Sequence, residues 1–205
     1  MLILTSSNNY VTLHFVQFLS KKPEEIRLTF IPTAGEVEKG DKGWLNEDRQ
    51  ALVDAGFVVS DFTLTGKSQE EVREMLQRTD FVFVSGGNTF FLLQEMNRSG
   101  FSELIGEYIE KGMIYGGTSA GSIVAGPDID LVGGLDDPTV APDLKSYQGL
   151  GLTDVVVFPH WGSEQFRERY EKVMKNGYKK GLRIILLTDD QYLLVEEGKY
   201  SIESI

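Results

Sequence analysis

The chain has 205 residues, of which 41% are hydrophobic and 25% charged, and this predicts one globular domain over residues 1–205 rather than a disordered or fibrous protein. Its formal net charge of −11 argues against nucleic acid and anionic membranes as partners, because both are negatively charged as well. The chain contains no cysteine, which excludes disulfides, thiolate metal sites and a cysteine nucleophile.

The N-terminal segment from Met1 to Thr5 lacks the basic residues and the long apolar run of a secretory signal. No stretch of the chain reaches the roughly 18 apolar residues of a membrane span. We therefore expect a soluble, cytoplasmic protein. No internal repeat and no low-complexity tract interrupts the sequence, in agreement with a single domain.

Short runs of β-branched and aromatic residues alternate with longer segments of helical period, as expected for parallel strands joined by crossover helices. We expect strands at residues 2–4, 28–31, 58–64, 81–85, 113–116, 155–158, 184–187, 192–195 and 200–205. We expect helices at residues 9–19, 42–55, 68–77, 89–97, 102–111, 119–125 and 163–179. The predicted fold is α/β, with a mostly parallel central sheet and helices on both faces.

A glycine pair, Gly86-Gly87, lies between the expected strand 81–85 and the expected helix 89–97. Backbone N–H groups at such a turn can stabilise the oxyanion that forms when a nucleophile attacks a carbonyl group. The alternative is a tight connection from strand to helix with no chemical role. The pair alone does not distinguish the two interpretations.

The segment Gly117-Thr118-Ser119-Ala120-Gly121 directly follows an expected strand and precedes a helical pattern. This is the G-x-S-x-G nucleophile turn in the strand-turn-helix context that it requires. The glycines permit a strained turn that exposes the serine hydroxyl at the sheet edge, and the helix N-terminus faces the developing negative charge. The pattern predicts Ser119 as a nucleophile, and a glycine-rich turn with a helix-capping serine is the alternative.

A serine nucleophile needs a base near neutral pH, and histidine is the usual one. His14 lies inside a helical pattern, away from any strand end, which favours a structural role. His160 follows the apolar strand 155–158, at the carboxyl edge of the sheet where the sites of open α/β folds gather. We therefore expect His160 to be the base, and simple packing between Pro159 and Trp161 is the alternative.

The third group of such a site is an acid that orients the imidazole. Residues 126–152 show no sustained period, and a loop of this length is uncommon unless it has a function. Its aspartates are Asp128, Asp130, Asp136, Asp137 and Asp143. Composition does not choose among them, and for most of them hydrogen bonding to their own turn is the alternative.

Three motifs occur in a fixed order along the chain. They are Ser85-Gly86-Gly87-Asn88-Thr89-Phe90, Gly117-Thr118-Ser119-Ala120-Gly121-Ser122 and Phe158-Pro159-His160-Trp161. Together they resemble the peptidase E family, the aspartyl dipeptidases related to cyanophycinases, and the similarity extends over most of the chain. The resemblance implies a three-layer α/β sandwich, like the glutamine amidotransferase and flavodoxin folds, with a Ser-His-acid triad. It also suggests a homodimer.

The resemblance assigns roles to the residues that match the family's motifs. Ser119 looks like the nucleophile and His160 like the general base. The groups that look like oxyanion donors are the backbone N–H groups of Gly86, Gly87 and Ala120. The family's acid lies in a D-x-P context between the serine and the histidine, which matches Asp136, with Asp137 as the alternative.

Substrate binding is also expected from the resemblance, at Asn88 and Thr89 of the glycine segment. Family members that cleave after an N-terminal aspartate recognise that side chain through an arginine downstream of the histidine. Arg167 and Arg169 are the nearest matches here. The alternative for both is a solvated helix position paired with neighbouring glutamates.

The resulting hypothesis is hydrolysis of a short peptide with an N-terminal aspartate through an acyl-enzyme on Ser119, without a cofactor. An isoaspartyl or cyanophycin-type peptidase, or a small esterase with the same triad, is a second interpretation. A third, of another class, is a non-catalytic module that binds a small anion at helix N-termini. A metalloenzyme is disfavoured, because the two histidines are far apart and His160 has no carboxylate at metal-ligand spacing.

Overall fold

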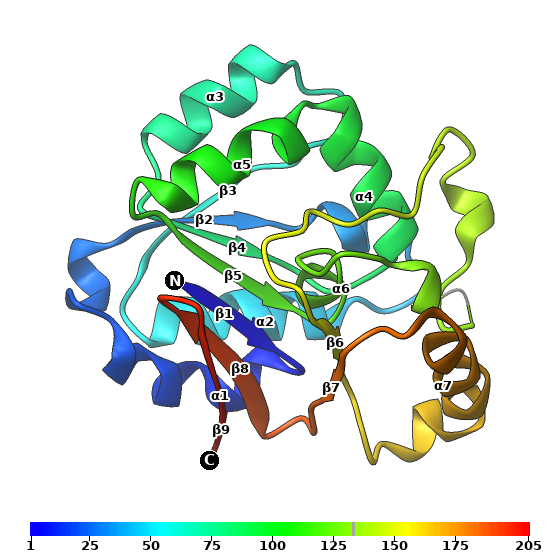
Figure 1. Ribbon diagram of the computed structural model, residues 1–205. Coiled ribbons are helices and arrows are strands. Elements are labelled where there is room, and N and C mark those ends of the chain that lie inside the picture. Colours follow the sequence, from blue (N-terminus) through cyan, green and yellow to red (C-terminus); the bar gives the residue numbers. More distant parts are fainter. Residues whose placement is uncertain (133) are drawn as a thin grey trace.

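The computed structural model describes residues 1–132 and 134–205, without the side chains of residues 168, 169, 172, 176, 179 and 180. Within this part of the chain, seven strands form a large sheet in the order β3-β2-β4-β5-β1-β8-β9, and two strands form a small one (Figure 1). The large sheet contains β1 (Leu2–Thr5), β2 (Arg27–Ile31), β3 (Val58–Asp61), β4 (Phe81–Val84), β5 (Ile114–Thr118), β8 (Gln191–Glu196) and β9 (Lys199–Ser204). The small sheet contains β6 (Val156–Phe158) and β7 (Ile184–Leu186).

The strands β1 to β5 pair in parallel, whereas β8 and β9 are antiparallel at one end of the sheet. The mostly parallel sheet and the nine predicted strands are confirmed within the described residues, with end shifts of a few residues. The largest shift is in β3, which was predicted to extend to Leu64 but ends at Asp61. The Phe62 N–H still donates to the Phe30 carbonyl of β2 at 3.0 Å, and two residues later the Leu64 N–H donates to the Thr33 hydroxyl at 2.9 Å.

Alternating side chains divide the core between the two faces of the sheet. On β4, Phe81 and Phe83 pack with residues of α1 and α2, whereas Val82 and Val84 pack with residues of α3, α4, α5 and α6. This alternation follows from the two-residue period of a strand and produces three layers (Figure 1). The helices are α1 (Asn8–Phe15), α2 (Gly43–Asp54), α3 (Gln69–Gln77), α4 (Thr89–Arg98), α5 (Phe101–Glu110), α6 (Ala120–Ile123) and α7 (Arg167–Lys180).

The small sheet has a core of its own. Phe158 of β6 and Tyr170 of α7 pack together with buried residues of both elements and of the long loop. The strands β6 and β7 pair in parallel, with Phe158 opposite Leu186, so both strands end at the same edge of the small sheet. Beyond the strands, the Trp161 N–H donates to the Leu187 carbonyl at 2.9 Å. The residues that follow β6 and β7 are therefore held side by side.

The long loop of residues 126–152 packs beside α4. An isolated bridge joins Asp128 to Gln148 near its two ends. In its middle, the Asp143 N–H donates to the Gln94 side chain at 2.8 Å, and the Asp143 carboxylate pairs with Arg98. These contacts hold the loop against the helix that begins directly after the glycine pair. In the described part of the chain, no helix has both the length and the apolar composition needed to cross a membrane.

Candidate active site

Ser119 lies in a strained turn between β5 and α6. Its φ of 49° and ψ of −109° are unusual for a residue with a side chain. A Cβ atom on Gly117 would lie 2.4 Å from the Gly121 carbonyl, and one on Gly121 would lie 2.2 Å from the Val84 carbonyl oxygen. Both flanking positions therefore require glycine, because backbone approaches backbone on each side of the serine.

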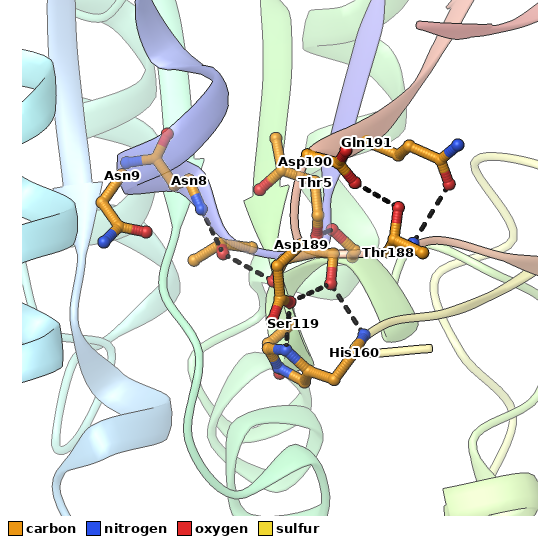
Figure 2. A network of polar contacts seen from close by, with 12 residues as sticks. Thr5, Asn8, Asn9, Ser119, His160, Thr188, Asp189, Asp190 and Gln191 are labelled. Atoms are coloured by element: carbon orange, nitrogen blue, oxygen red, sulfur yellow. Dashed lines mark hydrogen bonds and ion pairs between the residues drawn. The ribbon is translucent and has the colours of Figure 1, made fainter. Parts of the chain in front are cut away.

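His160 meets Ser119 from the other sheet. The imidazole Nε2 lies 3.1 Å from the Ser119 Oγ, within hydrogen-bond distance (Figure 2). His160 itself has a φ of 58°, so it also adopts a left-handed conformation that a side chain disfavours. Ser119 and His160, which are predicted from different features of the sequence, are therefore in direct contact.

The carboxylate on the other imidazole nitrogen belongs to Asp189, which follows β7. Its Oδ1 lies 2.7 Å from His160 Nδ1 (Figure 2). The hydrogen bond from His160 lowers the pKa of the Asp189 carboxyl, and one from Ser6 lowers it further, whereas burial opposes both. An ionised carboxylate only accepts hydrogen bonds, so Nδ1 carries the proton and Nε2 is left to accept one from the Ser119 hydroxyl.

Contrary to the sequence-based expectation, neither Asp136 nor Asp137 is the partner of His160. The Asp136 carboxylate accepts a hydrogen bond from the Thr89 N–H at 2.9 Å, at the start of α4. The Asp137 carboxylate accepts from the N–H and hydroxyl of Thr139, at 2.9 and 2.7 Å. Both therefore satisfy backbone donors at the beginning of a helical turn, where N–H groups have no partner within the turn itself.

Asp189 was missed because the acid was sought between the serine and the histidine. The signal that could have found it is the same strand-end rule that selected His160, since Asp189 lies two residues after the expected strand 184–187. Parallel pairing of that strand with 155–158 would place both side chains at one edge. Sequence order is irrelevant to such a triad, which is defined by geometry.

The glycine pair predicted to supply oxyanion donors lies next to Ser119. A Cβ atom on Gly86 would lie 3.3 Å from the Ser119 Cβ, so the two residues are in contact. Gly87 has a φ of 127° and packs under Ala34, whose carbonyl carbon would be 2.3 Å from an added Cβ. Among the described residues, no hydrogen-bond acceptor contacts the N–H groups of Gly86, Gly87 or Ala120. These three groups are the ones expected to bind an oxyanion.

Asn88 and Thr89, which were expected to bind substrate, are engaged with the protein itself. The Asn88 side chain caps α4 by accepting from the Phe91 N–H at 3.0 Å and donates to the Asp137 carbonyl at 3.0 Å. The Thr89 N–H binds Asp136, and its hydroxyl is buried without a hydrogen-bond partner in the described part of the chain. Both residues fix the end of the glycine segment beside the long loop.

Of the two arginines expected to recognise an acidic substrate, only Arg167 has a described side chain, and that of Arg169 lies outside the described residues. Arg167 is exposed and pairs with Glu164 at 3.3 Å. It directly follows Phe166, whose ring stacks on the His160 imidazole with centroids 4.8 Å apart. Arg167 is therefore adjacent in sequence to Phe166, which contacts the triad histidine.

Two carboxyl groups, those of Asp48 and Glu38, have raised pKa values. Burial raises the pKa of Asp48, on α2, to about 7, although a hydrogen bond from the Asn9 N–H and the charge of His160 act in the opposite direction. Burial also raises the pKa of Glu38, as does the charge of Asp136. In the described chain, no three histidine, aspartate or glutamate side chains are grouped so as to hold a metal ion.

Comparisons with known proteins show which family the chain resembles. The sequence profile described as "Peptidase family S51" matches residues 1–203. The uncharacterized peptidase Lin0382 of Listeria innocua is 34% identical over 196 residues, which cover 96% of this chain and 92% of that protein. Peptidase E of Shewanella amazonensis is 31% identical over 176 residues, which cover 85% and 68%. The crystal structure of a candidate peptidase E protein from Listeria monocytogenes EGD-e superposes with a TM-score of 0.92 at 31% identity, over 100% of this chain and 98% of that one.

The glycine requirement of the turn can be tested by adding one methyl group. Gly121→Ala should lower the free energy of unfolding by about 1–3 kcal/mol, because the added Cβ overlaps the Val84 backbone. Gly106→Ala is the matched control, since it lies inside α5 with open space around the added Cβ, and it should raise stability by about 0.5–1 kcal/mol. Urea unfolding measures both, and equal effects would contradict the steric argument.

The buried Asp48 should make stability depend on pH. The pKa of Asp48 is raised from 3.8 to about 7 in the folded protein, so the unfolded chain loses this proton first and stability falls as pH rises through that window. Asp48→Asn removes this loss. The unfolding free energy of the variant relative to wild type should therefore increase by roughly 2 to 4 kcal/mol between about pH 4 and about pH 7.

Urea titrations at several pH values measure this difference. Asp54→Asn, on the exposed side of the same helix, is the control for the loss of one acidic residue. A difference between the Asp48→Asn protein and wild type that stays constant across the window would mean that Asp48 is already ionised in the folded protein.

Proposed function

The chain belongs to peptidase family S51 and is a serine-type peptidase, and on that premise we propose that it hydrolyses short peptides through an acyl-enzyme on Ser119. The observation that supports the proposal most strongly is the continuous hydrogen-bonded chain of Ser119, His160 and Asp189, with contacts of 3.1 and 2.7 Å. These distances are those of a nucleophile and a base already within reach of proton transfer.

In the first step, the Ser119 Oγ attacks the carbonyl carbon of the peptide bond while His160 Nε2 takes the hydroxyl proton. The resulting imidazolium is stabilised by the Asp189 carboxylate, which keeps its negative charge throughout. The carbonyl oxygen becomes an oxyanion, and the N–H groups of Gly86, Gly87 and Ala120 are the proposed donors to it.

Collapse of the tetrahedral intermediate breaks the C–N bond, and the leaving amine receives the proton from His160 Nε2. The acyl group then remains on Ser119 as an ester. Water attacks that ester with His160 again acting as the base, and the serine hydroxyl is regenerated when the imidazolium returns the proton. No redox change occurs, and every proton that leaves a nucleophile passes through one imidazole nitrogen.

We propose dipeptides with an N-terminal aspartate as the preferred substrates, with Arg167 as the cation that binds the acidic side chain. Its position beside Phe166, which stacks on His160, supports this choice, and the resemblance to the peptidase E family suggests it. An acidic ligand needs such a cation, because Glu38 and Asp136 add negative charge to the region.

The assignment of Asp189 as the triad acid predicts that Asp189→Asn and Asp136→Asn have unequal effects on kcat. Ser119→Ala should abolish turnover, and Asp189→Asn should lower kcat by about 10³- to 10⁴-fold, because the imidazole loses the partner that fixes its tautomer. Asp136→Asn should lower kcat by less than about tenfold, because Asp136 binds the Thr89 backbone instead of His160. Steady-state kinetics on a cleaved dipeptide distinguish the two aspartates, and a larger loss in Asp136→Asn than in Asp189→Asn would reverse the assignment.

The substrate class can be tested with a panel of Asp-X, isoaspartyl and Ala-X dipeptides. If Arg167 binds the acidic side chain, Arg167→Ala should raise KM for Asp-X dipeptides at least about tenfold and leave that for Ala-X unchanged, because one charge-assisted pair is lost. Glu164→Gln, which frees the arginine from its ion pair, is the matched control and should not raise KM. Preferential cleavage of isoaspartyl or Ala-X peptides by wild type would refute the aspartate specificity while leaving the triad intact.

A further inference from the structure

Ser6 forms a bridge between the imidazole segment and the acid of the site. It follows β1 directly and is fully buried, with 0% of its surface exposed. Its Oγ lies 2.7 Å from the His160 backbone nitrogen and 2.8 Å from the Asp189 Oδ1. The same carboxylate oxygen accepts the hydrogen bond from His160 Nδ1. One hydroxyl therefore contacts both residues that activate Ser119.

The direction of both hydrogen bonds follows from the chemistry of the partners. A backbone N–H can only donate, so the Ser6 oxygen accepts from His160. An ionised carboxylate can only accept, so the single hydroxyl proton of Ser6 is directed to Asp189. The only hydroxyl proton of Ser6 is thus used by Asp189, and removal of the hydroxyl would leave the His160 N–H without this acceptor.

Hydrogen bonds join the backbone of residues 5 and 6 to the nucleophile turn. The Thr118 hydroxyl donates to the Ser6 carbonyl at 3.2 Å, and the Ser119 N–H donates to the carbonyl of the preceding residue, Thr5, at 3.1 Å. Ser119 belongs to the large sheet, whereas His160 and Asp189 follow strands of the small sheet. Ser6 therefore joins the two sheets at the point where the triad is assembled.

His160 needs such support because of its backbone conformation. A φ of 58° is disfavoured for a residue with a Cβ and persists only when the surroundings impose it. The N–H of His160 is bound by Ser6, and its carbonyl accepts a hydrogen bond from the Tyr170 hydroxyl. Of these two backbone contacts, only that of Ser6 also reaches the acid of the triad.

We propose that Ser6 is a positioning residue of the reaction, which aligns His160 and Asp189 against Ser119 through its side-chain hydroxyl. The inference rests on the proposed function. It predicts that Ser6 affects the reactivity of Ser119 without contacting the substrate, so its loss lowers kcat and leaves KM nearly unchanged.

A fluorophosphonate probe tests the inference without knowledge of the natural substrate. The Ser119 Oγ forms a bond to phosphorus, the P–F bond breaks with loss of fluoride, and His160 Nε2 takes the hydroxyl proton. Ser6→Ala should be labelled about 10- to 100-fold more slowly than wild type, per folded molecule, because small misalignments of a base are costly. Ser6→Thr keeps the hydroxyl and should recover most of the rate.

Ser99→Ala is the matched control, since Ser99 is also fully buried but binds the Met96 carbonyl in α4. It should be labelled at the wild-type rate. Labelling of folded Ser6→Ala at the wild-type rate, while Ser119→Ala is not labelled, would overturn the role of Ser6 and leave the proposed function standing. If Ser119→Ala were labelled as fast as wild type, the proposed function itself would fail.

A structural role alone would lower thermal stability but not the labelling rate of the folded fraction. If Ser6→Ala does not fold, Ser6→Cys provides the same comparison, because a thiol is a weaker donor and acceptor of similar size. Slower labelling of folded Ser6→Cys than of Ser99→Ala supports the inference, and equal rates contradict it.

Discussion

The hydrogen bond between Ser119 and His160 connects two sheets that share no strand. Ser119 follows β5 of the large sheet, and His160 and Asp189 follow β6 and β7 of the small one. The chemistry proposed for this protein depends on that junction, because a nucleophile separated from its base by an additional ångström loses much of its reactivity. The packing of the small sheet is therefore as important to the site as the nucleophile turn.

Strained backbone is concentrated at this junction. Ser119 and His160 both have positive φ values, and each such conformation costs of order 1–3 kcal/mol. The surroundings that impose it are closely packed: glycine allows the backbone to approach on both sides of Ser119, and Phe166 and Tyr170 of the small-sheet region contact His160. The strain aligns the hydroxyl and the imidazole before any substrate is bound.

Much of this arrangement could be predicted from the sequence, because strands and helices follow local periodicity. Ser119 was recognised from glycine spacing and His160 from its position after an apolar run. The same strand-end rule points to Asp189, but preferring it to the loop aspartates requires the parallel pairing of β6 and β7, which is a contact between distant segments. Asp136 misled the prediction because an aspartate in a loop serves equally well as the acceptor for a helix N-terminus, as it does for Thr89.

A crystal structure of the protein after reaction with a fluorophosphonate would test the assignment of Ser119, His160 and Asp189, since the bound phosphonyl group resembles a tetrahedral intermediate. We expect phosphorus bonded to the Ser119 Oγ, one phosphonyl oxygen within hydrogen-bond distance of the Gly86, Gly87 or Ala120 N–H groups, and Asp189 on His160 Nδ1. An unmodified Ser119, or an imidazole bound to Asp136 in place of Asp189, would contradict it.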